Sequence, residues 1–127
     1  MRFEDEKDYV MRIIKEMVRV LFSLMFGKEY VSVELEDENK YEVSGKNLRE
    51  LLDMADRGEI NEAENYILST MDYGKKLEVA AAAYFYQHLS EKEEDFLRQN
   101  NYSMEEVLDG MKQLMQDAGY ADFIQWL

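Results

Sequence analysis

The feature that most constrains the fold is a wide apolar helix near the start of the chain. Residues 9–26, YVMRIIKEMVRVLFSLMF, predict a helix that ends at Gly27, a residue that favours the backbone conformation of helix stops. Its polar residues fall in one arc of roughly 100°, and apolar residues cover roughly 220° of the rest. An ordinary surface helix carries a narrower apolar stripe of about 100°. This helix therefore has more apolar surface than one neighbouring helix covers.

Several environments accommodate such a helix. A membrane span is disfavoured, because the longest run without a charge is residues 20–26, far short of the roughly 20 residues that a span needs. Attachment to a membrane surface is disfavoured as well, since the rest of the chain would be repelled by anionic lipid. Two interpretations remain: a central helix wrapped by other helices, or a helix with one face in its own core and another against a partner or a second copy. Val18, Phe22 and Met25 are the candidates for this core or dimer face.

Charge is distributed unevenly along the chain, whose net charge is −13. Residues 1–28 hold six bases and five acids, so the later residues carry a net charge of −14. Such acidity disfavours nucleic acid as a partner and favours a basic partner or simple solubility. Arg12, Lys15 and Arg19 form the one basic stripe, which pairs with acids of the body or binds an acidic partner.

The length of 127 residues and the amino-acid composition favour a single helical domain. Cysteine is absent, so the domain has no disulfides. The first ten residues, MRFEDEKDYV, carry acids where a secretory signal carries bases, so a cytoplasmic protein is expected. We expect three parts: the long apolar helix over 1–28, a hairpin or loop over 29–46, and helical hairpins with a docked C-terminal tail over 47–127.

Within the second part, residues 30–43 alternate between apolar and polar side chains on either side of the polar turn DENK. This alternation predicts a small β-hairpin or an ordered extended loop that lies on the helices.

From residue 47 onward the pattern predicts five helices, so that the fold is mainly α, a bundle of about six helices in antiparallel pairs. Capping boxes are predicted to begin four of them, at Asn47, Asn61, Ser90 and Ser103. The five expected ranges are 47–57, 61–71, 75–89, 90–99 and 103–118.

The second and third helices of the chain meet across a short connection. Gly58, Ile60, Ala63 and Ile67 are spaced as in the middle of a tetratricopeptide unit, where small residues let paired helices approach closely. No second copy follows at the 34-residue period of such units, so we predict one tetratricopeptide-like hairpin rather than an array.

Two motifs also carry a resemblance to a family. The segments DYVMRIIKEMVRVL and GEINEAEN together resemble a family of small, uncharacterised acidic helical proteins from Firmicutes. The resemblance implies a bacterial protein and no established activity.

No pattern indicates catalysis or a cofactor. His88 is the only histidine and lacks the Glu-x-x-His spacing of a helical di-iron site. We interpret it as a rim residue beside Tyr84 rather than a general base. The acid clusters lack the order of a calcium loop and are interpreted as solvated helix starts. We therefore expect no enzyme activity, no metal and no cofactor.

Tyrosine and methionine are abundant, at nine residues each. Flexible methionines fill cores and also line adaptable peptide grooves. We hypothesise that Tyr66, Tyr73, Tyr84 and Tyr86 line such a groove, with His88 at its rim. The predicted function is a non-catalytic helical protein–protein interaction module that holds a peptide or a helix. One form of this prediction is a homodimer in which the two copies meet through their first helices. The alternative is an acidic decoy that binds a basic, nucleic-acid-binding protein.

Overall fold

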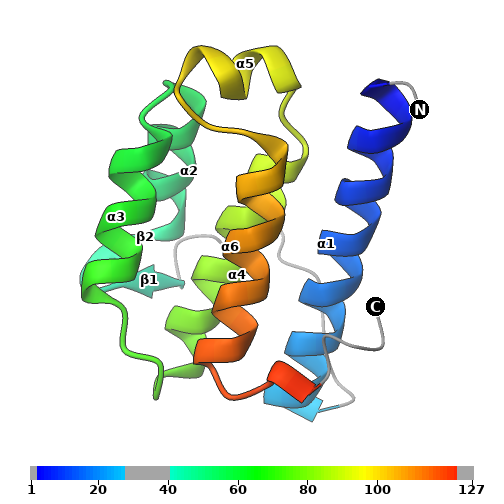
Figure 1. Cartoon of the computed structure of the whole chain (residues 1–127). Helices are drawn as coiled ribbons and strands as arrows, with labels where there is room; N and C mark the ends of the chain where they lie inside the picture. The colour runs from blue at the N-terminus through cyan, green and yellow to red at the C-terminus, as the bar shows by residue number, and fades with distance from the viewer. Residues whose placement is uncertain (1–2, 28–40, 123–127) are drawn as a thin grey trace.

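A computed structural model describes residues 3–27 and 41–122 (Figure 1). Within these ranges the chain forms six helices and one two-stranded sheet, which confirms the mainly α fold class. In chain order the elements are α1 (Phe3–Phe26), β1 (Glu42–Val43), β2 (Lys46–Asn47), α2 (Leu48–Asp56), α3 (Ile60–Thr70), α4 (Lys76–Ser90), α5 (Glu94–Gln99) and α6 (Met104–Asp117).

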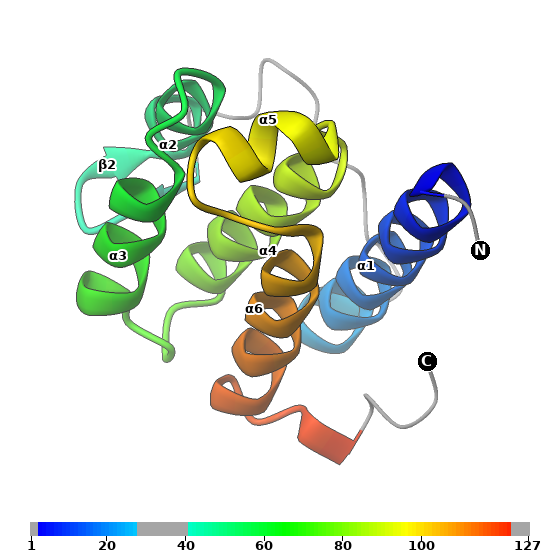
Figure 2. The same cartoon turned by 45° about the horizontal axis from the view of Figure 1, so that its top comes forward.

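The central helix of the bundle is α4, which contacts α1, α2, α6 and β1 (Figure 2). Its residues from Glu78 to Tyr86 are all buried, so the helix is enclosed on every side. Four of them are consecutive alanines, whose small side chains let neighbouring helices approach closely on all faces. The interpretation of α1 as the central helix is therefore wrong.

At the edge of the bundle, α1 packs on α4 and α6 (Figures 1 and 2). Its buried face includes Val18, Phe22 and Met25, of which the most exposed, Met25, retains only 5% of its surface. The Phe22 ring meets the Tyr84 ring edge to face, with centroids 4.8 Å apart. The three candidate residues for a core or dimer face thus lie in the core of their own chain.

The α2–α3 pair forms the predicted helical hairpin and packs on α4 through α2. Gly58 makes the turn between the two helices with φ +91°, a conformation that residues with a Cβ rarely adopt. A Cβ there would also lie 2.8 Å from Cγ of Asn100, so the turn approaches the α5–α6 connection closely. Ile60, Ala63 and Ile67 are all buried, so the apolar face of α3 lies in the core.

The small sheet is antiparallel and pairs Glu42 with Asn47 and Val43 with Lys46. Its turn is Ser44–Gly45, both with positive φ, which matches the twist of a two-residue hairpin loop. Tyr41 and Val43 are buried while Glu42 is exposed. The apolar side chains of this segment therefore face the helices, and its polar side chain faces outward. The part of the predicted hairpin that precedes residue 41, the DENK turn included, lies outside the described residues.

Two of the four predicted capping boxes begin helices. Asn47 accepts a hydrogen bond from the Glu50 backbone N–H at 2.9 Å, and Ser103 accepts one from that of Glu106 at 3.1 Å. The other two predictions are wrong. Helix α3 begins at Ile60, so Asn61 lies within its first turn, and Ser90 is the last residue of α4 rather than the cap of α5.

Candidate interaction surface

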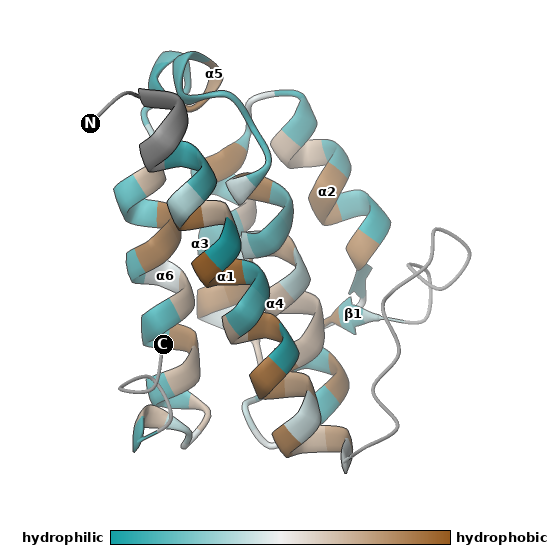
Figure 3. Cartoon of the chain, turned by 90° about the vertical axis from the view of Figure 1, so that its right-hand side faces the viewer, coloured by the Kyte–Doolittle hydropathy of each residue, from teal (hydrophilic) through white to brown (hydrophobic). Residues whose placement is uncertain are grey.

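One apolar stripe of α1 is incompletely covered. Tyr9, Ile13, Val20 and Leu24 fall within an arc of roughly 60° beside the buried face. Tyr9 is 53% exposed and Leu24 is 37% exposed, while Ile13 and Val20 are half-buried. We call these four residues the outer stripe. Figure 3 shows α1 in the foreground, with hydrophobic residues recurring along it on this open side of the bundle. The outer stripe accounts for the excess apolar width that the sequence shows.

The three residues of the basic stripe, Arg12, Lys15 and Arg19, are exposed, and two of them have acidic partners. Lys15 lies 3.9 Å from Glu91 with both side chains half exposed, and Arg19 pairs with Glu16 on its own helix. Arg12 is exposed and has no ion pair among the described residues. Exposed pairs of this kind contribute about 0–1 kcal/mol each, so the basic stripe is chiefly a charged border beside the outer stripe.

The four candidate tyrosines do not share a groove. Tyr84 and Tyr86 are buried, so the hypothesis that they line an exposed groove is wrong. Tyr66 is half-buried and donates its hydroxyl to the Ser44 carbonyl at 2.7 Å. Only Tyr73 is exposed, and its hydroxyl lies 3.4 Å from Oδ2 of Asp117. Each ring belongs to a different contact of the fold.

A partly buried polar cluster joins α3, α4 and the start of α6. The hydroxyls of Tyr86 and Tyr102 both donate to Oε2 of Glu64, at 2.7 and 2.8 Å. Burial, followed by the negative charge of Glu64, raises the pKa of each of these tyrosines well above its ordinary value. Both hydroxyls therefore remain protonated donors, and Glu64 acts as their shared acceptor. In the sequence analysis Glu64 is the fourth residue of the capping box predicted at Asn61. That pattern gives no indication that Glu64 accepts hydrogen bonds from two tyrosines.

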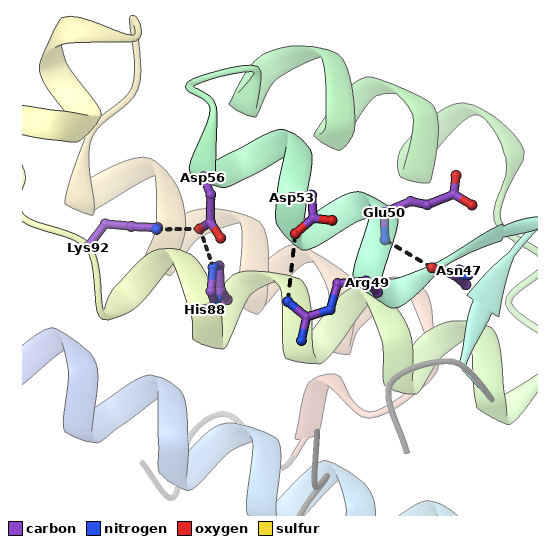
Figure 4. Close-up of polar contacts among 7 residues, drawn as sticks. All are labelled: Asn47, Arg49, Glu50, Asp53, Asp56, His88 and Lys92. Carbon is purple, nitrogen blue, oxygen red and sulfur yellow. Dashed lines mark hydrogen bonds and ion pairs between the residues drawn. The ribbon is translucent and has the colours of Figure 1, made fainter. Parts of the chain in front are cut away.

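His88 takes part in a different network, at the junction of α2, α4 and α5 (Figure 4). Its Nε2 lies 2.7 Å from Oδ1 of Asp56, and the Lys92 ammonium binds the same oxygen. Partial burial alone would raise the pKa of Asp56, but the hydrogen bonds from Lys92 and His88 outweigh it and hold that pKa below its usual range. The network ties the end of α2 to the end of α4.

Metal sites, membrane spans and ligand pockets can be assessed only within residues 3–27 and 41–122. No group of three or more histidine and carboxylate side chains there is arranged to hold a metal ion. No helix in those ranges has both the length and the apolar character needed to cross a membrane. One small pocket of about 110 Å³ is well below the roughly 300 Å³ of typical ligand sites. It is lined by Glu94, Arg98, Ser103, Met104 and Glu105.

The fold and these surfaces define a small, mainly α-helical domain with a partly open apolar edge. Residues 4–119 match the family of unknown function DUF6483, so the chain belongs to that family. No curated protein and no solved structure matches the chain.

Proposed function

We propose that this protein is a non-catalytic helical protein–protein interaction module whose contact surface is the outer stripe of α1. The observation that carries the proposal is the exposure of Tyr9 and Leu24 on α1. Other apolar residues of this helix already form its contact with the core, so these two side chains are not needed for that contact. Apolar side chains aligned along one helix face are the usual anchors of helix-to-helix recognition. The partner accordingly presents an apolar helix face, either from another protein or from a second copy.

In this proposal the α2–α3 hairpin serves as a tetratricopeptide-like support rather than as the contact surface. Leu48, Leu51, Ile60 and Ile67 are fully buried, so the apolar face of the hairpin is used within the chain. The hairpin holds the bundle together and leaves recognition to α1.

The test is affinity capture from a lysate of the source organism at two salt concentrations, read by mass spectrometry. Wild type is compared with Leu24→Glu and with Leu68→Glu, because Leu68 on α3 is similarly exposed at 47%. We expect the captured proteins, including untagged copies of the chain, to be lost with Leu24→Glu and kept with Leu68→Glu. Circular dichroism establishes that both variants are folded. If all three proteins capture the same set, the outer stripe is not the contact surface.

A second candidate, an acidic decoy for a basic protein, is favoured by the net charge of −14 after residue 28. Exposed acids at the start of α5 and in the first turn of α6, such as Asp95, Glu105 and Glu106, contribute to this charge. A decoy would capture basic proteins that dissociate at high salt and are indifferent to Leu24→Glu, because counterions screen exposed charges.

A further inference from the structure

We infer that the outer stripe is a two-fold interface between two copies of this chain, with their α1 helices antiparallel. The inference rests on the proposed function and names its partner. Isologous two-fold contacts require a surface that is complementary to itself. The outer stripe has that property, for two reasons given by its spacing and its charges.

The spacing of the outer stripe is the same in both directions. Its residues, Tyr9, Ile13, Val20 and Leu24, are separated by four, seven and four positions. An antiparallel two-fold axis near Glu16 therefore places Tyr9 opposite Leu24 and Ile13 opposite Val20 in each half of the interface. Large side chains at the ends meet each other, and β-branched side chains meet near the centre. The contact runs for about 22 Å along each helix, at 1.5 Å per residue.

The charge at the centre of this interface is already compensated within each helix. Glu16, which lies nearest to the axis, is bound by the guanidinium group of Arg19 one turn along, with Nε of Arg19 3.2 Å from Oε2. Two unpaired glutamates facing each other across the axis would repel, whereas two paired ones carry little net charge. Arg12, exposed beside the stripe, adds a positive charge on the same border.

The charge of the whole chain also selects this face. Self-association through most other surfaces brings together two bodies that each carry −14 after residue 28. The charges of α1 nearly balance, with four bases against five acids, so this helix is where two copies meet with the least repulsion. Residual repulsion between the bodies is screened by salt, and dimerisation through α1 should therefore strengthen as ionic strength rises.

Sedimentation equilibrium over a range of protein concentrations tests the association itself. We expect a monomer–dimer equilibrium whose dissociation constant falls with added salt. Leu24→Glu should raise this constant at least about tenfold, since the symmetry buries the new carboxylate twice. Leu68→Glu should leave it unchanged apart from the added charge. A monomer at every concentration and salt condition, or a dimer insensitive to Leu24→Glu, would overturn the inference.

Disulfide trapping tests the orientation, in a chain that has no cysteine of its own. Bridged residues have Cα atoms about 4.4–6.8 Å apart, so only facing positions link. A mixture of Tyr9→Cys and Leu24→Cys chains should link under mild oxidation, while Leu24→Cys alone and the control Leu68→Cys should not. Linking of Leu24→Cys chains to one another would indicate a parallel pair and overturn the antiparallel arrangement, as would a dimer whose mixed cysteines never link.

The two experiments separate this inference from the proposed function. A strictly monomeric chain whose captured partners still depend on Leu24 leaves the interaction module standing and removes the homodimer. A chain that neither associates with itself nor loses any partner on Leu24→Glu removes both.

Discussion

Gly110, in the middle of α6, provides the sharpest test of the packing. Replacing glycine with alanine in a helix normally stabilises it by about 1 kcal/mol, because glycine has more backbone freedom to lose. Here a Cβ would lie 2.7 Å from Cζ and 2.9 Å from the hydroxyl oxygen of Tyr86, with Cε1 nearer still. Carbon atoms in contact are about 3.5–4.0 Å apart, so the ring must retreat by about 1 Å.

The Tyr86 ring has little room for this movement. It is 99% buried, and its hydroxyl is fixed 2.7 Å from Oε2 of Glu64. Overpacking of a close-packed site costs about 1–3 kcal/mol, and a disturbed buried hydrogen bond costs about 1–3 kcal/mol more. After subtracting the gain in helix propensity, Gly110→Ala should lower the free energy of unfolding by about 3 kcal/mol. For a domain of this size that corresponds to a fall in Tm of about 11 °C.

Urea denaturation followed by far-UV circular dichroism measures this effect. Gln116→Ala, at an exposed position of α6, should change the free energy of unfolding by less than about 0.5 kcal/mol and is the control. In a Tyr86→Leu background, the cost of Gly110→Ala should largely disappear. A Gly110→Ala variant as stable as wild type, or a cost that persists in the Tyr86→Leu background, would refute the reasoning.

Three further predictions concern polar contacts. Glu64→Ala should lower the free energy of unfolding by about 2 kcal/mol in urea denaturation, because two buried tyrosine hydroxyls lose their shared acceptor; an unchanged midpoint would contradict this. Asp56→Asn should cost about 0.5–1 kcal/mol near neutral pH, a small value because the carboxylate is partly exposed. Since the folded-state pKa of Asp56 is lowered, its contribution is present above the unfolded pKa and is lost as pH falls through the folded pKa. The Tm difference from wild type should therefore shrink below about pH 4, and a constant difference down to pH 2 would exclude this origin. Ser103→Ala should cost about 1 kcal/mol in urea denaturation as the loss of a helix cap, and an unchanged midpoint would contradict the assignment of this cap.

Much of the fold could be predicted from the sequence, because its signals are local. The caps at Asn47 and Ser103 act on backbone groups three residues away. The stops at Gly27 and Gly58 depend on the conformation of one residue, and both have positive φ. At these four positions the local signal was a sufficient guide, whereas the same capping pattern at Asn61 and Ser90 does not begin a helix.

The candidate site was less predictable, because its partners are distant in sequence. Asn61 has the residue type of a cap, yet its amide donates to the carbonyls of Asn100 and Asn101. The hydrogen-bond partner of His88 is Asp56, which lies 32 residues earlier in the chain. No periodicity within one helix indicates such contacts.

The first helix shows where this division falls. By itself the sequence determined that residues 9–26 form a helix with an apolar surface too wide for one neighbour, since side-chain periodicity follows from helix geometry alone. Only the tertiary structure decided that α4, with its four small alanines, occupies the centre and that α1 keeps the outer stripe partly exposed. Covering a helix face depends on which distant segments reach it, and that is settled by the packing of the whole chain.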